Sequence, residues 1–283
     1  MMQVAIIGAA GKMGAWFCGY FARQKSEVSA FDVKPFQIKG VRNAASIADC
    51  VKNADLVMVC VPVKHTPAVI KRCAPEMKQG ALLFEISSVK AGTLPALKKT
   101  RKDIIALCVH PMFGPGASEK KQLKMLAVPV RDRTKEVDAI NSVFAGMAVK
   151  VLPDARTHDR AIAAVLGLTY FANVAFAGVL AREDLATLNK VGGTTFTIQA
   201  MLAQSVMTDE PELIAALIRD NPQASRYMRQ YLKEAGALAS AGGPALEAKL
   251  KKTKKILQKQ ADLDAAYKRM YGIIGLLDRP STE

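Results

Sequence analysis

Three glycines that directly follow an apolar run limit the fold more than any other feature of this chain. "MQVAIIGAAGKMGAWF" places Gly8, Gly11 and Gly14 between a strand-like run and a helix-like stretch. Residues without side chains let backbone N–H groups and the N-terminus of the following helix approach a pyrophosphate. Asp32 ends the second strand-like run, at the distance where a carboxylate accepts hydrogen bonds from ribose hydroxyls. The pattern predicts a dinucleotide-binding loop that consists of Gly8, Ala9, Ala10, Gly11, Lys12, Met13 and Gly14.

Asp32 also bears on which dinucleotide is bound. Its carboxylate would repel the 2′-phosphate of NADP, so we expect NAD. Lys34 could serve that phosphate instead, and NADP therefore stays open. The third strand-like run ends in "CVPVKHT", and we expect Val61, Pro62 and Val63 beside the cofactor. His65 follows them, and a loop position at a helix entry explains it better than a direct role.

Strand-like and helix-like runs alternate through the first half of the chain. The five runs that we expect to be strands are "MQVAIIG", "EVSAFD", "ADLVMVCVP", "ALLFEIS" and "IIALCVH". Such alternation indicates βαβ units and a doubly wound parallel sheet. The fold class is therefore α/β: an N-terminal Rossmann-type domain over residues 1–152 and an all-helical C-terminal domain over 153–283.

The second half is rich in Ala, Leu and Val, and its helices are too apolar to face water all round. Burial against a second subunit explains this, so we expect a homodimer through the helical domain. Pro67 and Pro211 can stand in first helical turns. The Gly/Ala-rich stretch 236–245 should break the chain before a last, basic helix.

Composition limits the partners and the location. The formal charge is +15, with many lysines in "KLKKTKKILQKQ". A solvated helix face explains this cluster better than a nucleic-acid site, and a positive field also suits a small anionic substrate. The five cysteines form no C-x-x-C pair, so we expect reduced thiols, no disulfide and no metal site. No uninterrupted apolar run has the length of a membrane span, and no leader pattern opens the chain, so we expect a cytoplasmic protein without a membrane.

Two neighbouring strand-like runs end in polar residues of catalytic type. "FEISSVKAG" delivers Ser87 and Ser88, and "IIALCVHPMFGP" delivers His110. Ligands of open α/β sheets bind beyond the carboxyl ends of the strands. There, a histidine of near-neutral pKa could take a hydroxyl proton while a hydride leaves the same carbon. We expect His110 and Ser88 to be catalytic and Ser87 to lie at the cofactor.

The motifs "GAAGKMG", "VPVKHTPAVI", "EISSVKAG" and "HPMFGP", in this order, resemble the prephenate/arogenate dehydrogenase family over residues 1–150. The resemblance implies oxidative decarboxylation of prephenate in tyrosine biosynthesis, with His110 bonding the ring hydroxyl and Ser88 assisting. It also implies a helical domain that forms the dimer. We predict that the following residues contact substrate: Lys90, Met112, Gly114, Tyr170, Arg219 and Arg226.

The helical half departs from the family pattern. Thr169 and Tyr170 stand where relatives carry a histidine, often next to an arginine. Gln204 and Ser205 stand near the place of an arginine that grips the ring carboxylate, although Arg219 or Arg226 could substitute for it. The alternatives are therefore arogenate, an amino-deoxy analogue or another hydroxy acid as substrate, or a dinucleotide-binding regulatory protein without turnover.

Overall fold

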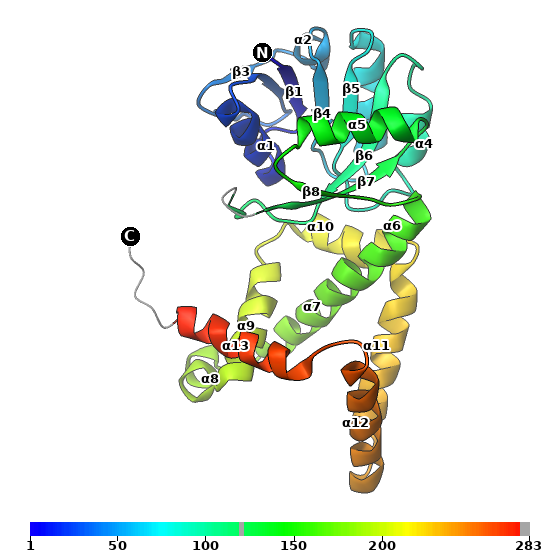
Figure 1. Cartoon of the computed structure of the whole chain (residues 1–283). Coiled ribbons are helices and arrows are strands. Elements are labelled where there is room, and N and C mark those ends of the chain that lie inside the picture. The colour runs from blue at the N-terminus through cyan, green and yellow to red at the C-terminus, as the bar shows by residue number, and fades with distance from the viewer. Residues whose placement is uncertain (119–121, 278–283) are drawn as a thin grey trace. The chain divides into compact units, whose positions relative to one another are not determined.

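The computed structural model describes residues 1–118 and 122–277, which fall into two compact units (Figure 1). The first unit comprises Met1–Ala163 and Asp220–Gln223, and the second comprises Ala164–Arg219 and Ala224–Glu283. The first unit therefore extends to Ala163, whereas the sequence predicts that the first domain ends at residue 152. The reason is that the first helix after the sheet buries His158 and Ile162 in the first unit.

The first unit is built on an eight-stranded sheet of order β3-β2-β1-β4-β5-β6-β7-β8. The strands are β1 (Gln3–Ile7), β2 (Glu27–Phe31), β3 (Val41–Asn43), β4 (Leu56–Val59), β5 (Leu82–Glu85), β6 (Ile105–Pro111), β7 (Lys124–Pro129) and β8 (Ala148–Val151). All pairings from β3 to β6 are parallel, β7 runs antiparallel to β6, and β8 is parallel to β7. The five predicted strands and the Rossmann-type sheet are confirmed, and β3, β7 and β8 extend the sheet at its two edges.

Helices cover both faces of this sheet. α1 (Lys12–Arg23) and α5 (Arg133–Val143) pack on one face, against alternate strand residues such as Ile6, Met58 and Leu107. α2 (Ile47–Val51), α3 (Thr66–Cys73), the 3₁₀ turn Ala74–Glu76 and α4 (Leu94–Lys98) lie on the other face. Because side chains alternate along a strand, each central strand contributes to both cores. The carboxyl ends of β1, β4, β5 and β6 are thereby held at one edge.

The second unit is helical, as predicted. Its elements are the π-helical turn Ala163–Leu168 that continues α6 (Ala155–Ile162), then α7 (Thr169–Leu180), α8 (Leu185–Val191), α9 (Thr194–Val206), α10 (Pro211–Ala215), a second π-helical turn (Ala216–Asp220), α11 (Ala224–Ala239), α12 (Gly243–Gln258) and α13 (Leu263–Leu277). Pro67 and Pro211 lie in first helical turns, as expected. Two expectations are wrong. Most of 236–245 is helical, because α11 and α12 leave only 240–242 between them, and the basic helix α12 is followed by α13.

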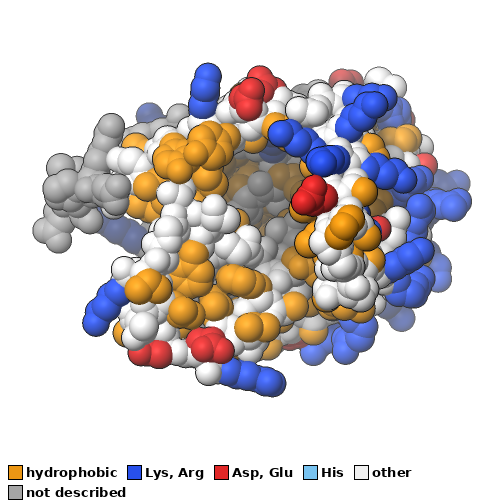
Figure 2. Space-filling model, turned by 90° about the horizontal axis from the view of Figure 1, so that it is seen from below, with side chains coloured by type: hydrophobic (Ala, Val, Ile, Leu, Met, Phe, Trp, Pro, Cys, Tyr) orange, Lys and Arg blue, Asp and Glu red, His pale blue; other side chains and the backbone are white. Residues whose placement is uncertain are grey.

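The helical unit exposes much apolar side-chain surface. Leu232, Leu250 and Leu276 are each more than half exposed. Figure 2 shows several patches of hydrophobic side chains on the face that it draws. The helix Ala155–Leu180 is 26 residues long, and its most apolar window has the mean hydropathy (1.8) of a membrane span. Thr169, Tyr170 and Asn173 divide its charge-free stretch 161–181, so no uninterrupted apolar run there reaches the length of a membrane span. The first turns of this helix bury His158 and Asp159 within the first unit.

The cysteines are unpaired thiols in the structure, as the sequence predicts. Cys18, Cys50, Cys73 and Cys108 are buried, and Cys60 is partly buried. Burial raises the pKa of Cys18 and of Cys50 to about 12, so these thiols stay protonated and act as small core residues.

Candidate active site

The glycine loop has the geometry that a bound pyrophosphate needs. Gly8 has φ +98°, and a Cβ there would lie 2.6 Å from the Cys60 carbonyl oxygen. A Cβ on Gly14 would lie 2.0 Å from the Gly8 oxygen, so the turn and α1 pack as closely as only glycine permits. Gly11 caps α1 without a side chain, and no acidic residue occupies the first turn. The N–H groups of this turn therefore face no carboxylate of their own helix, which suits an anion.

Asp32 lies directly after β2, beside this loop. Its Oδ2 accepts the N–H of Ala10 at 3.0 Å and its Oδ1 accepts the N–H of Lys34 at 2.9 Å. A carboxylate has about four lone-pair positions, so both oxygens can accept further hydrogen bonds. The side chain is partly exposed. The residues present thus fit a dinucleotide, with the loop at the pyrophosphate and Asp32 at a ribose.

The loop after β4 lies at the point where the strand order reverses, between β1 and β4. Cys60 N donates to the carbonyl of Ile7 at 2.7 Å, which ties this loop to the glycine turn. Val61 and Val63 are partly buried and Pro62 is exposed, so the backbone here is accessible where such folds bind ligands. His65 is an exposed residue that precedes α3, the loop position that the sequence suggests.

Lys90 is not available to a substrate. Its side chain is fully buried, and Nζ donates to Glu85 Oε1, to the Ser87 carbonyl and to the Val109 carbonyl, each at 2.7 Å. These three acceptors use all three ammonium protons. The prediction that Lys90 contacts substrate is therefore wrong, because its charge instead joins the ends of β5 and β6.

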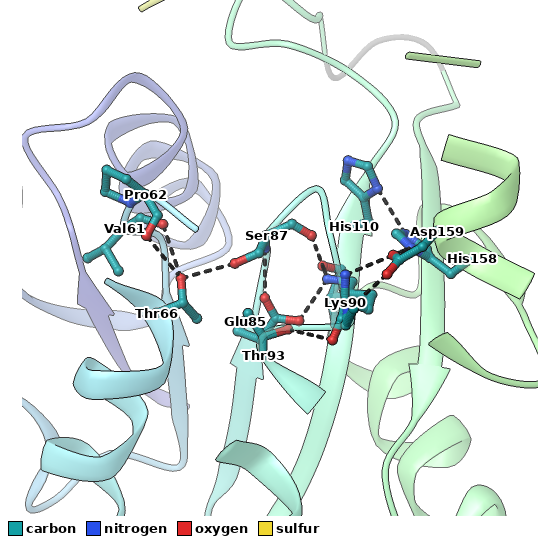
Figure 3. A network of polar contacts seen from close by, with 12 residues as sticks. Val61, Pro62, Thr66, Glu85, Ser87, Lys90, Thr93, His110, His158 and Asp159 are labelled. Carbon is teal, nitrogen blue, oxygen red and sulfur yellow. Dashed lines mark hydrogen bonds and ion pairs between the residues drawn. The ribbon is translucent and has the colours of Figure 1, made fainter. Parts of the chain in front are cut away.

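Ser87 and Ser88 differ in what their hydroxyl groups contact. Ser87 is buried, and its Oγ lies 3.0 Å from the Oγ1 of Thr66, in the network of Figure 3. Its N–H donates to Glu85 Oε2 at 2.8 Å. Ser88 is partly exposed, and its hydroxyl has no partner among residues 1–118 and 122–277. Of the two serines, Ser88 is the one that offers a hydroxyl group.

His110 lies near the end of β6, at the same edge. Because Glu85 pairs with Cys108 in the parallel register, Ser87 and His110, two residues further along, lie at the same level. His110 is 3% exposed, and its Nδ1 lies 3.0 Å from the Nε2 of His158. Figure 3 shows its other ring nitrogen directed away from His158. Burial, the Lys90 ammonium and His158 hold the pKa of His110 well below 6.5, so the imidazole is neutral at pH 7.

The Nε2 of His110 is the ring nitrogen that remains available for reaction. Within the described ranges, it has no hydrogen-bond partner. In the same ranges, no fully buried side-chain nitrogen or oxygen lacks a partner, so this nitrogen is not sealed from its surroundings. A neutral histidine with an accessible ring nitrogen can exchange a proton with a bound hydroxyl group.

His158 and Asp159 join the site although the sequence analysis did not single them out. Both lie within α6 and are buried, and His158 is 48 residues after His110. His158 Nδ1 lies 2.8 Å from Asp159 Oδ1. A sequence signal existed, because a buried helix rarely carries a His-Asp pair without partners for it. The side chains that such a pair would meet cannot be read from a single sequence.

Three of the predicted substrate residues, Tyr170, Arg219 and Arg226, belong to the second unit. Tyr170 donates its hydroxyl to the Asp209 carboxylate at 2.6 Å, and this bond together with burial raises its pKa. Arg219 and Arg226 are exposed, as are Gln204 and Ser205 on α9. In the first unit, Met112 is partly buried and Gly114 is exposed, in the loop after β6. The roles of these residues in substrate binding stay predictions.

The fold and this site define a nucleotide-binding α/β domain of the Rossmann type. Residues 25–153 match the family model described as "Prephenate dehydrogenase, nucleotide-binding domain". The chain is similar to a probable arogenate/prephenate dehydrogenase of Methanocaldococcus jannaschii, with 25% identity over 82% of the chain and 55% of the relative. It is also similar to a 4-amino-4-deoxyprephenate dehydrogenase of Streptomyces pristinaespiralis, with 27% identity over 78% of both chains.

Solved structures share the fold over nearly the whole chain. The crystal structure of Aquifex aeolicus prephenate dehydrogenase with hydroxyphenyl propionate and NAD+ has a TM-score of 0.70 and 19% identity, over 96% of this chain and 98% of that one. Synechocystis arogenate dehydrogenase has a TM-score of 0.65 and 16% identity, over 92% and 100%. The resemblance to the prephenate/arogenate dehydrogenase family is thus confirmed. The chain spans about half the length of several curated relatives that it matches (55–57%).

Replacing Lys90 should destabilise the first unit strongly. Lys90→Met leaves the fully buried Glu85 carboxylate without its cation, which costs about 3–5 kcal/mol of the free energy of unfolding. Urea unfolding measures the loss. The control is Lys78→Met, which breaks the exposed pair with Asp55 and should cost less than about 1 kcal/mol. Equal losses in the two variants would contradict the role given to Lys90.

The free energy of unfolding should fall as the pH is lowered from 7 to 5. Burial lowers the pKa of His110 and of His158 below 6.5, so the unfolded chain binds more protons than the folded chain in this window. The free energy of unfolding then rises with pH by up to about 1.4 kcal/mol per pH unit for each histidine, and it levels off above about pH 6.5. Urea unfolding at several pH values measures this slope, which should be smaller in His158→Gln. A flat profile between pH 5 and 7 would refute it.

Proposed function

We propose that this chain catalyses the NAD(P)-dependent oxidative decarboxylation of prephenate or arogenate, as in tyrosine biosynthesis. The observation that carries the proposal is the buried, neutral His110, whose Nε2 is accessible at the edge where β5 and β6 end. The match of residues 25–153 to the nucleotide-binding domain of prephenate dehydrogenases supports it.

The residues that would hold the cofactor are those of the glycine loop and the loop after β4. Gly8, Gly11 and Gly14 would admit the pyrophosphate, and Asp32 would accept the ribose hydroxyls. Bound NAD supplies a hydride acceptor for the ring carbon that bears the hydroxyl group. Asp32 favours NAD over NADP, although Lys34 lies beside it and one relative is named as an NADP-dependent prephenate dehydrogenase.

The chain's own residues would manage the hydroxyl proton. His110 Nε2 accepts this proton while the hydride leaves, and the ring then loses carbon dioxide and becomes aromatic. The Ser88 hydroxyl can donate a hydrogen bond to the same oxygen. Aromatisation makes the reaction strongly downhill, so the protein needs to position the proton acceptor rather than to supply a powerful one.

The substrate should be a small anion, in keeping with the charge of +15. One observation favours a relative of prephenate as a second candidate. The Tyr170 hydroxyl is committed to Asp209 within the helical unit, in a region where relatives carry a histidine, so recognition there differs from the family pattern. The similarity to a 4-amino-4-deoxyprephenate dehydrogenase supports an amino-deoxy analogue. Arg219 and Arg226 remain the proposed partners of the substrate carboxylates.

We also propose that the helical unit pairs with a second copy of the chain, since its large exposed side chains include Leu232, Leu250 and Leu276. A cytoplasmic location without membrane or nucleic-acid partners completes the proposal.

Replacing His110 should abolish turnover without preventing cofactor binding. His110→Asn removes the proton acceptor, and kcat with prephenate should fall by about 10²–10⁴. Ser88→Ala should lower kcat less, by about tenfold, because it removes one neutral hydrogen bond. Absorbance at about 340 nm follows the nicotinamide, and NAD titration of the variants checks binding. His65→Asn is the matched control. Full activity in His110→Asn would refute the assignment, and turnover with an amino-deoxy analogue alone would select the second candidate.

Asp32→Asn should weaken NAD binding by about 10-fold to 100-fold, because hydrogen bonds from the ribose to a charged acceptor are lost. NADP binding should change less or improve, since the repelling charge is removed. Titrations with both dinucleotides measure the ratio. Lys34→Gln tests the alternative: a specific loss of NADP binding there, with NAD binding unchanged, would assign the 2′-phosphate to Lys34.

A further inference from the structure

Three side chains of the first unit, His110, His158 and Asp159, form a continuous hydrogen-bonded chain. His110 Nδ1 contacts His158 Nε2 at 3.0 Å, and His158 Nδ1 contacts Asp159 Oδ1 at 2.8 Å (Figure 3). Both ring nitrogens of His158 are therefore engaged. Its side chain is fully buried, so water does not replace either partner. The hydrogen bonds of Asp159, at the end of the chain away from His110, determine which ring nitrogens carry protons.

The far end is fixed by backbone donors. Asp159 Oδ1 accepts the N–H of Lys90 at 2.8 Å, and Oδ2 accepts the N–H of Ala91 at 2.9 Å. Peptide N–H groups can only donate, and a carboxylate only accepts. The carboxylate thus also accepts from His158, whose Nδ1 carries a proton. Asn221 donates to the Asp159 carbonyl at 2.8 Å and helps to hold this residue in place.

The same logic passes through His158 to His110. Burial lowers the pKa of His158 and outweighs the opposite effect of Asp159, so its ring is neutral and Nε2 has a lone pair. The charged groups that face it are Asp159 and Glu85, which favour a proton, and Lys90, which opposes one. With Nε2 as the acceptor, His110 Nδ1 must be the donor. The proton of the neutral His110 ring is then on Nδ1, and Nε2 has a lone pair.

We propose that His158, oriented by Asp159, is a positioning residue that holds His110 in the Nδ1–H tautomer and so keeps Nε2 free to take the substrate's hydroxyl proton. This inference rests on the proposed function for its chemistry but not for its geometry. In the reaction, the O–H bond breaks, its proton forms an N–H bond at Nε2, and the electron pair of the C–H bond leaves as hydride to the nicotinamide. The His110 imidazolium that results donates its Nδ1–H to His158.

Because the chain has few histidines, the tautomer of His110 can be measured directly. The chain has three histidines, His65, His110 and His158, so nitrogen-15 labelling of histidine gives three ring spectra. Nitrogen shifts distinguish a protonated ring nitrogen from one with a lone pair. In the full-length protein at pH 7.5, His110 and His158 should both show protonated Nδ1 and unprotonated Nε2. His110→Asn and His65→Asn assign the signals.

Two variants of His158 separate the tautomer from mere packing. His158→Leu removes the acceptor, so His110 should change to the Nε2–H tautomer and kcat should fall by about 100-fold or more, with the KM for NAD unchanged. His158→Gln offers one acceptor and one donor, as His158 does, so it should keep the Nδ1–H tautomer and retain kcat within about tenfold. Thermal unfolding checks that each variant is folded.

A wild-type spectrum with protonated Nε2 on His110 would overturn the inference, and so would an unchanged tautomer in folded His158→Leu. If His158→Leu does not fold, the wild-type spectrum and His158→Gln still decide, since a Gln variant with the Nε2–H tautomer would contradict the role of the acceptor. Failure of the proposed function has a different signature: no reduction of NAD with prephenate or arogenate, while the predicted spectra are seen.

Discussion

The buried Lys90 holds together the part of the structure on which the site depends. Its ammonium joins the β5 carboxylate of Glu85 to the backbone beyond β5 and to the carbonyl of Val109 in β6. Its own N–H donates to Asp159. A charge buried without such partners would cost several kcal/mol, so the strand ends and the start of α6 are held in one arrangement. Ser88 and His110 lie within this arrangement.

The site combines cofactor binding and proton transfer, and these two functions have different physical origins. The glycine turn and the start of α1 provide closely spaced backbone N–H groups, which suit a pyrophosphate and need no side chains. The ends of β5 and β6 provide side chains whose protonation is set by burial and by neighbours. The glycine turn and the start of α1 account for cofactor binding alone. The second requires His110 to be neutral, accessible at one nitrogen and fixed at the other, and buried neighbours achieve this without a carboxylate in direct contact with His110.

The sequence predicts much of this because its strongest signals are local. The glycine loop, Asp32 and the apolar strands depend on spacing along the chain, and the structure confirms the strands and the Rossmann-type sheet. Lys90 was misassigned because burial is set by the packing of β5 on β6, which a lysine in a loop-like stretch does not reveal. His158 was missed for a related reason. Its partner is 48 residues away, and only the fold brings the two rings to 3.0 Å.

The most direct test of the central claim is the stoichiometry of the reaction. Purified protein, prephenate and NAD should yield one carbon dioxide for each NADH, with an aromatic product in the same amount. Labelled carbon dioxide from prephenate carrying carbon-13 in the ring carboxylate, measured beside NADH absorbance, would give this ratio. A ratio of one supports oxidative decarboxylation. Formation of NADH without carbon dioxide, or of neither product with prephenate and with arogenate, would contradict the account.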